Sequence, residues 1–317
     1  MKGFSLLIKC FFLFCVATSL EAVEKICSET ECYTVIETLG EGAFGTVYSV
    51  EDSQGHKFAL KSLKTHPAFP NSILEDIARE YQRGQMLDHK NIIKSLDVFT
   101  DSSNEEISHN LLLQLVEGET LYNVEKGVLS IQLVFNAVSE FSDALKHALS
   151  IDLLHLDLHD GNIMMTNNRE IMLVDLASFF TIDEFMAFID ENQVSQAKSV
   201  RVQIEKNDLK VQKMEKFRQR IKAISKNFPQ RNAAKTAAVN PIDRDLIHFY
   251  YYSAITEVCT HIMEKSSLSE DEKLAMKEEL RNLVSSMEAS YQEGKPVSSE
   301  DFFERLLSVF QPISLVN

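Results

Sequence analysis

The stretch that decides the fold is HLDLHDGN at residues 155–162, which is followed by VDLA at residues 174–177. It places Asp157 and Asn162 five positions apart, and a second aspartate, Asp175, comes after an alternating apolar run. One aspartate can orient or deprotonate a hydroxyl group, while an asparagine and another aspartate offer the oxygen ligands that magnesium prefers. The same residues could also form a polar turn between two strands, so the rest of the chain must distinguish these interpretations.

The composition is that of a globular protein, with 317 residues of which 44% are hydrophobic and 25% are charged. A chain of this length can bury one large core or two modest ones, and we expect two lobes or domains. The net charge of −15 argues against general affinity for nucleic acid, because the phosphate backbone attracts basic surfaces.

Residues 1–22 have the pattern of a secretory signal peptide. A basic start at Lys2 precedes an apolar core that includes CFFLFCV at residues 10–16, and Ser19 and Ala22 offer cleavage points. An uncleaved anchor is the alternative, but Lys9 breaks the apolar run and leaves it short for a membrane span.

Three cysteines would remain after cleavage: Cys27, Cys32 and Cys259. The first two could close a small loop in an oxidising compartment, which leaves one thiol over. We therefore expect an exported protein, secreted or periplasmic, with an N-terminal segment at residues 23–32 ahead of the main fold.

A glycine-rich turn follows this segment. LGEGAFGTVY at residues 39–48 places Gly40, Gly42 and Gly45 between β-branched and aromatic runs, which predicts a hairpin whose turn carries few side chains. Backbone N–H groups in such a turn can approach a phosphate closely. Residues 57–63 then alternate as a strand.

Helical spacing of apolar residues predicts a helix from about residue 73 to residue 87, with Glu80 near its middle. Residues 110–116 read as a buried strand, and helices dominate beyond them. A boundary near residues 116–119 would separate a β-rich first lobe from a helical second lobe.

Several elements are predicted in the second lobe. Apolar residues at helical spacing indicate a helix over about 133–148, and two short strands around the turn at 167–169 predict a hairpin with Asn162 at one end and Asp175 at the other. Closing helices are expected at 269–291, where Ser269 and Glu272 form a capping box, and at 299–310.

In motif, order and spacing, residues 33–176 resemble the eukaryotic-type protein kinases. The resemblance implies an α+β, bilobal, protein kinase-like fold with a β-rich N-lobe at 33–116 and a helical C-lobe at 117–317. It also implies that magnesium and ATP bind between the lobes.

The resemblance assigns nucleotide-binding roles to residues of the N-lobe. Lys61 in the motif FALK would contact the α- and β-phosphates, and Glu80, nineteen positions later, would pair with it, with Glu75 as the alternative. Backbone groups of the hinge would contact the adenine edge. The residues expected around the nucleotide are Leu39, Gly40, Gly42, Gly45, Val47, Ala59, Lys61, Gln114, Leu115, Val116 and Met164.

The catalytic loop supplies the remaining roles that the resemblance implies. Asp157 would be the base, Asn162 and Asp175 would hold magnesium, and His159 would replace the lysine that usually neutralises the γ-phosphate. A histidine can still donate a hydrogen bond to phosphate. In this respect HLDLHDGN is similar to the loop of choline and aminoglycoside kinases.

Other positions depart from the protein kinase pattern. Leu156 replaces the arginine that precedes the catalytic aspartate, so we do not expect activation by loop phosphorylation. Ala177 stands where glycine is usual, which restricts the backbone. No Ala-Pro-Glu motif closes an activation segment, and seventy positions separate Asp175 from Asp245, at the start of the expected central helix.

This long insertion, at about residues 181–240, reverses the local charge. From residue 198 to residue 235 there are twelve Lys or Arg residues against three acidic ones. The segment predicts a basic amphipathic helix that docks an acidic partner or an anionic membrane, or a helix packed on the protein with a solvated basic face. Its apolar face would comprise Val211, Met214, Phe217, Ile221 and Ile224, with Lys210, Lys213 and Lys216 outside it.

The sequence thus favours an exported kinase that uses ATP and magnesium to phosphorylate serine or threonine of a protein substrate, as a secreted effector that could be delivered to a host cell. Two alternatives stay open. His159 and the unusual activation segment are compatible with a small-molecule kinase, and Ala177 and export are compatible with a silent nucleotide-binding or interaction module.

Overall fold

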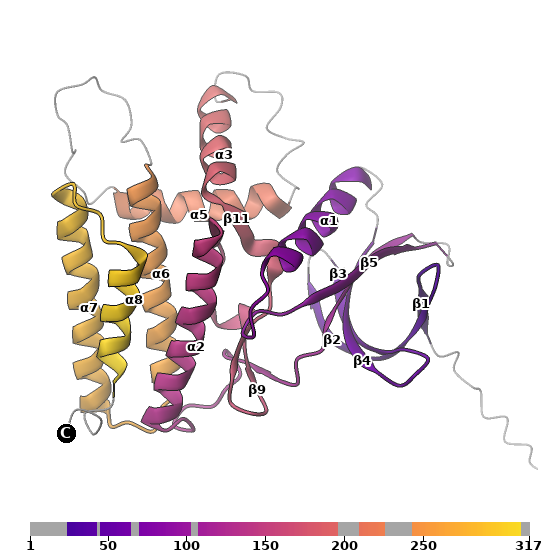
Figure 1. Cartoon of the computed structure of the whole chain (residues 1–317), viewed down its shortest axis with the longest axis horizontal. Coiled ribbons are helices and arrows are strands. Elements are labelled where there is room, and N and C mark those ends of the chain that lie inside the picture. Colours follow the sequence, from indigo (N-terminus) through magenta and orange to yellow (C-terminus); the bar gives the residue numbers. More distant parts are fainter. Residues whose placement is uncertain are drawn as a thin grey trace, which may run out of the picture.

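The computed structural model describes residues 24–42, 45–64, 70–102, 107–195, 209–225 and 243–311. A curled sheet with one helix forms one lobe, and a bundle of helices forms the other (Figure 1). The architecture confirms the expected α+β bilobal fold. The predicted signal peptide lies outside the described residues.

An antiparallel sheet with strand order β1-β2-β3-β4-β6-β5 builds the N-lobe. Alternate residues of its strands face opposite sides, so Leu60 and Leu112 join one small core while Ala59 and Leu113 join the main core. Opposite Ala59 in the register lies Leu113, which places the start of the hinge beside β4. The strands are β1 (Lys25–Cys27), β2 (Cys32–Gly42), β3 (Gly45–Glu51), β4 (Lys57–Lys64), β5 (Ser95–Asp101) and β6 (Ser108–Gln114).

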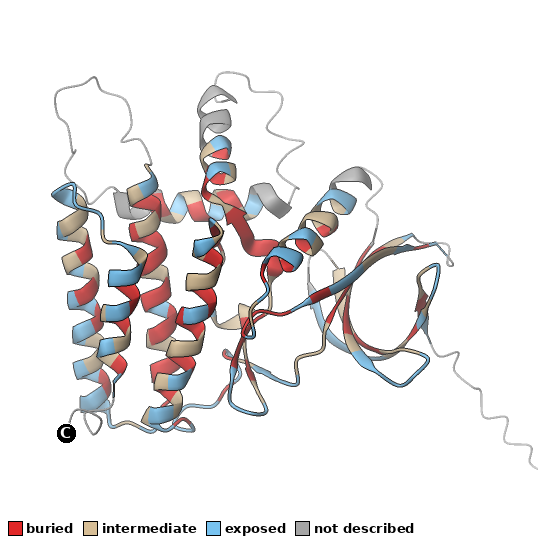
Figure 2. Cartoon of the chain, in the orientation of Figure 1, coloured by how far each residue is buried: buried red, intermediate tan, exposed pale blue. Residues whose placement is uncertain are grey.

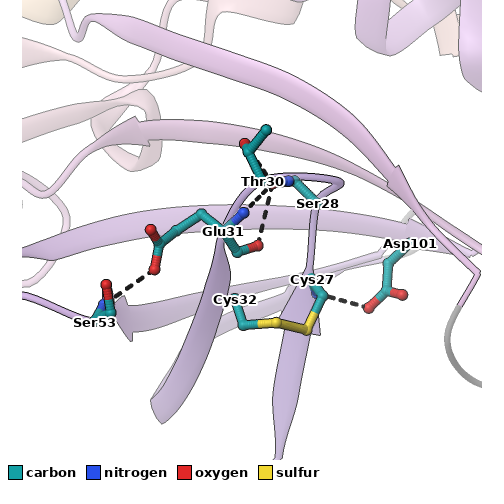
Figure 3. The surroundings of a disulfide bond; sticks show 7 residues. All are labelled: Cys27, Ser28, Thr30, Glu31, Cys32, Ser53 and Asp101. Atoms are coloured by element: carbon teal, nitrogen blue, oxygen red, sulfur yellow. Dashed lines mark hydrogen bonds between the residues drawn. A yellow bond between two sulfur atoms is a disulfide. The ribbon is translucent and has the colours of Figure 1, made fainter.

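Cys27 and Cys32 form a disulfide that closes the β1–β2 hairpin (Figure 3). The backbone N–H of Cys27 donates to the carboxylate of Asp101 on β5, which ties the hairpin to the far strand of the sheet. From the sequence, a disulfide between Cys27 and Cys32 was a possibility, and the structure contains it. The third cysteine, Cys259, is buried and free.

Helix α1 (Pro70–Met86) packs on the sheet and against the turn that follows Asp175. Its buried face centres on Ile77, with Ile73 and Tyr81 beside it. The helix begins three residues before the predicted start and ends one residue before the predicted end. Gly84 permits close approach to the C-lobe, because a Cβ atom there would lie 2.8 Å from a methyl group of Leu176.

The C-lobe is a helical bundle whose facing surfaces are buried, as Figure 2 shows. The capping box predicted at Ser269 and Glu272 is present at the start of α7. No helix in the described part of the chain is long and apolar enough to cross a membrane. The helices are α2 (Ile131–Ser150), α3 (Ile182–Ser195), α5 (Leu209–Ser225), α6 (Arg244–Glu264), α7 (Glu270–Gln292) and α8 (Ser299–Phe310).

Short strands between the lobes position the motif residues. The predicted hairpin forms as β9 (Ile163–Thr166) and β10 (Ile171–Leu173), and β7 (Gly118–Thr120) pairs with β9. Strand β8 (Leu153–His155) pairs with β11 (Phe179–Thr181). HLDLHDGN therefore connects β8 to β9, and Asp175 follows directly after β10.

Candidate active site

The two predicted charged residues of the N-lobe form an ion pair. The ammonium of Lys61 lies 2.9 Å and 2.6 Å from the carboxylate oxygens of Glu80, whose side chain is 4% exposed. Glu75, the alternative partner, is exposed to solvent. Burial disfavours the charged form of Lys61, but Glu80 and then Asp175 raise the pKa of the ammonium above its usual value. This pair fixes α1 against β4.

The two predicted magnesium ligands lie side by side. The amide nitrogen of Asn162 donates to the backbone oxygen of Asp157 at 2.8 Å and lies 3.5 Å from Oδ2 of Asp175. This orientation leaves the amide oxygen of Asn162 available as a ligand. No group of three or more His, Cys, Asp or Glu side chains among the described residues could hold a metal. A pair of side-chain ligands fits magnesium, which usually keeps waters and substrate phosphates as its other ligands.

Three neighbours surround the carboxylate of Asp175. The Ser178 hydroxyl donates to it, and the ammonium of Lys213 on α5 lies 2.6 Å from Oδ2. Burial alone would raise the pKa of Asp175, but the ammonium groups of Lys213 and Lys61 hold it well below its usual range. Asp175 is therefore ionised, and the ammonium of Lys213 is its partner in this structure.

The candidate base, Asp157, is also held by α5. The ammonium of Lys216 lies 2.5 Å from Oδ1 of Asp157, and Nε2 of His159 lies 3.8 Å from Oδ2. His159 is the N-terminal cap of the short 3₁₀ turn Asp160–Asn162, where its Nδ1 accepts the backbone N–H of Gly161. Its ring thus stabilises the catalytic loop from within.

Contacts from α6 anchor the catalytic loop. The hydroxyl of Tyr251 accepts the backbone N–H of His155 at 3.3 Å, and Nδ1 of His261 lies 2.6 Å from Oδ1 of Asp160. Asp245 lies in the first turn of the same helix. His155 is fully buried, and burial lowers the pKa of its imidazole to about 4.

Glycines of the β2–β3 hairpin leave its turn bare. A side chain added at Gly40 would meet no atom within 4 Å, whereas one at Gly45 would meet the backbone oxygen of Ser62 at 2.2 Å. Gly42 pairs with Gly45 next to the turn, and residues 43–44 lie outside the described part. The exposed backbone of this hairpin is the part of the fold that can approach a phosphate.

The expected adenine-binding residues lie on neighbouring elements. Ala59 is buried on β4 opposite Leu113, and the hinge residues after β6 are half-buried. Leu39 is exposed on β2. The half-buried members of the predicted set are Val47, Gln114, Leu115, Val116 and Met164.

Ala177 fits its place without backbone strain. It is buried in the 3₁₀ turn Leu176–Ser178, and the described non-glycine residues with positive φ are Asp152 and Arg169. The turn after Asp175 therefore does not need the conformational freedom of glycine.

Sequence reasoning missed three side chains of the site: Lys213, Lys216 and Ser178. The two lysines were expected on a solvated basic face or on a docking surface. Neither prediction included contacts between these lysines and the carboxylates of Asp175 and Asp157. The reversal of charge in residues 198–235 was the available signal, because a basic segment in an acidic chain can pair with carboxylates of the same protein.

The fold and the site together define a class of protein. A lysine–glutamate pair beside a bare glycine hairpin, facing an Asp, an Asn and a second Asp on the other lobe, is the arrangement of a bilobal phosphotransferase. Residues 33–186 match the family described as "Protein kinase domain". This part of the chain is therefore similar to the eukaryotic-type protein kinases.

Several proteins named as kinases are similar to this chain. The chain is 26% identical over 146 residues to a probable serine/threonine-protein kinase, glkA, of Dictyostelium discoideum, covering 46% of this chain and 29% of the relative. It is 27% identical over 146 residues to the serine/threonine-protein kinase PrkC of Bacillus subtilis, covering 45% and 22%. It is 28% identical over 151 residues to the mitogen-activated protein kinase pmk-3 of Caenorhabditis elegans, covering 44% and 32%. The chain spans less than a third of the length of these relatives.

Proposed function

We propose that this chain transfers the γ-phosphoryl group of ATP to serine or threonine of a protein substrate. The observation that carries the proposal is the closed Lys61–Glu80 ion pair, formed while Asp157, Asn162 and Asp175 face one catalytic centre. Catalysis in this class depends on positioning and electrostatic stabilisation, so the simultaneous presence of these groups is the main requirement.

Each residue has a role that follows from its surroundings. Lys61, oriented by Glu80, holds the α- and β-phosphates, and the glycine hairpin covers them with backbone N–H groups. Asn162 and Asp175 would hold magnesium, which when bound neutralises phosphate charge. Asp157 accepts a hydrogen bond from the acceptor hydroxyl and orients it.

The transfer balances as a single displacement. The acceptor oxygen forms a bond to the γ-phosphorus, and the bond from that phosphorus to the β,γ-bridging oxygen breaks. The bridging oxygen keeps the electron pair and leaves as part of ADP. The proton of the acceptor hydroxyl passes to Asp157.

An ion pair between the lobes supports activity without loop phosphorylation. Arg83 near the end of α1 lies 2.6 Å from the carboxylate of Glu184 on α3, which also accepts the backbone N–H of Thr181. Leu156 is buried and cannot bind a phosphate. The Arg83–Glu184 pair therefore holds α1 in place through a permanent carboxylate.

The test is a transfer assay with the full chain, labelled ATP and magnesium, alone and with generic protein substrates. Label on protein that is lost in both Asp157→Ala and Asp175→Ala supports the proposal, with a loss of about a hundredfold or more expected for each. Lys295→Met is the matched control, because this exposed lysine pairs with Glu293 at the surface. Label that persists in both aspartate variants would refute the assigned roles.

The two alternatives predict other outcomes of this assay. Nucleotide binding without any turnover would indicate a silent binding or interaction module. Transfer to metabolites but not to proteins would indicate a small-molecule kinase, which the histidine in HLDLHDGN motivates.

We further propose that the protein is exported and acts as a secreted effector. The signal-peptide pattern of residues 1–22 and the disulfide between Cys27 and Cys32 support export, because disulfides persist in oxidising compartments. Mature protein confined to the cytoplasm of the producing cell would contradict it. Binding of an acidic partner or an anionic membrane to residues 198–235 stays a prediction, and residues 196–208 and 226–242 lie outside the described part.

A further inference from the structure

Helix α5 places two cations on the two catalytic aspartates. Lys213 contacts Asp175 and the hydroxyl of Ser178 at 2.6 and 2.5 Å, and Lys216 contacts Asp157 at 2.5 Å. The lysines are one helical turn apart, so both reach the same site from one face of α5. This helix lies beyond residue 186, where the match to the kinase family ends.

The apolar face of α5 is part of the C-lobe core. Met214, Phe217 and Ile221 are buried, and the Phe217 ring packs edge-on against Phe185 at 5.0 Å and Tyr250 at 4.8 Å between centroids. A helix anchored by a core aromatic residue stays in place when ligands bind. The lysine side chains can still move, because each ammonium sits on a flexible four-carbon stem.

His159 stands at the loop position that usually carries a lysine, but its ring is turned toward the loop. Its Nδ1 accepts the Gly161 N–H at 3.0 Å. Its Nε2 lies 3.8 Å from Asp157, farther than Lys216. Lys216 is thus the cation in contact with the base.

The charge around the site favours such cations. Among the described residues, Lys61 pairs with Glu80 within the family-matched part, and the carboxylates of Asp157 and Asp175 lie beside it. Bound magnesium would neutralise part of the triphosphate charge, and cations from the protein would add to that neutralisation. The two lysines of α5 are such cations, and Lys216, with a side chain 49% exposed, is the more accessible of the two.

We propose that Lys216 contacts the γ-phosphate in the nucleotide complex and replaces the missing lysine of the catalytic loop. This inference rests on the proposed function. The acceptor hydroxyl bound by Asp157 attacks the γ-phosphorus, so a cation that touches Asp157 adjoins the transferred group. Lys216 contacts Oδ1 of Asp157, whereas Oδ2 lies 3.8 Å from Nε2 of His159, and we assign the acceptor hydroxyl to Oδ2. The lysine stabilises the charge on the phosphoryl oxygens during transfer.

The test compares two nucleotides in the presence of magnesium: ADP and the β,γ-imido analogue of ATP, which differ in the γ-phosphate. Lys216→Met should weaken binding of the imido analogue by about tenfold, the value of one charge-assisted hydrogen bond, and change ADP affinity less than about twofold. Lys216→Arg should bind the imido analogue almost as tightly as wild type, because arginine keeps the positive charge that Lys216→Met removes. Calorimetric titration of the full chain measures the dissociation constant of each protein for each nucleotide.

Several outcomes would overturn the inference. Equal affinity of wild type and Lys216→Met for the imido analogue would show that Lys216 does not contact the γ-phosphate. Tighter binding of both nucleotides by Lys216→Met would show that the lysine blocks the site instead. Lys295→Met should match wild type throughout. If wild type bound neither nucleotide, the proposed function itself would fail, which is a different result from equal binding by wild type and variant.

Discussion

Two sets of ion pairs surround the candidate active site, and they come from different parts of the chain. Lys61–Glu80 lies within the segment that matches the kinase family, and its partners are nineteen positions apart. Lys213–Asp175 and Lys216–Asp157 span 38 and 59 positions and join that segment to a helix beyond it. The match to the family therefore ends before the site does. In the proposed mechanism, the first set positions the nucleotide and the second adjusts the charge around the phosphates.

The largest effect is expected from the anchor of the second set. Phe217→Ala should lower the free energy of unfolding by about 3–5 kcal/mol, because a buried ring that packs on Phe185 and Tyr250 is lost. It should also weaken binding of the imido analogue, since α5 carries Lys216. Denaturant unfolding and calorimetry measure the two effects.

Phe303→Ala is the matched control for this prediction. Phe303 is fully buried in α8, where it contacts Phe302 and Tyr252 rather than α5. Phe303→Ala should lower the free energy of unfolding by a similar amount without changing the affinity for the nucleotide. Equal loss of affinity in both variants would mean that α5 has no special connection to the site.

His155 predicts a pH effect of intermediate size. Its pKa is about 4 in the folded protein because of burial and about 6.5 when unfolded, so only the unfolded state takes up the proton between these values. Stability that is complete above pH 6.5 should fall by about 1.4 kcal/mol per unit as the pH drops toward 4. Unfolding of wild type and His155→Gln across this range measures the contribution. Parallel pH dependences would exclude it.

Lys213→Met should have a small effect, and it should strengthen magnesium binding rather than weaken a function of the protein. Removing the ammonium from Asp175 eliminates a competitor of magnesium, so half-saturation should occur at about threefold to tenfold lower magnesium concentration. Titration of nucleotide binding with magnesium gives this value, and Lys295→Met should not reproduce the shift because Lys295 pairs with Glu293. An unchanged or higher magnesium requirement would argue that Lys213 does not occupy the metal position.

The first set was readable from the sequence and the second was not. A lysine in a strand and a glutamate nineteen positions later in a helix have a fixed separation, and the hairpin after Asn162 follows from its alternating residues. A basic amphipathic helix has the same pattern whether its lysines face solvent or a carboxylate. Which of these occurs depends on how α5 packs against α3 and α6, and such packing is set by contacts between segments far apart in the chain.

The same limit explains the anchors of the catalytic loop. The hydroxyl of Tyr251 contacts the backbone of His155, which lies 96 positions earlier in the chain. Three consecutive tyrosines occur in this apolar helix, and the sequence does not indicate which of their hydroxyl groups faces the catalytic loop. Cys27 and Cys32 are close in sequence, yet their pairing depends on the hairpin that brings them opposite each other.

The central claim is that α5 is a fixed part of the active site whose lysines move while the helix stays. Hydrogen–deuterium exchange of residues 209–225, with and without the imido analogue and magnesium, tests it most directly. The account predicts that protection of these amides is unchanged or increased when the nucleotide binds. Loss of protection throughout the helix would show that α5 leaves the site on binding, and would contradict the account.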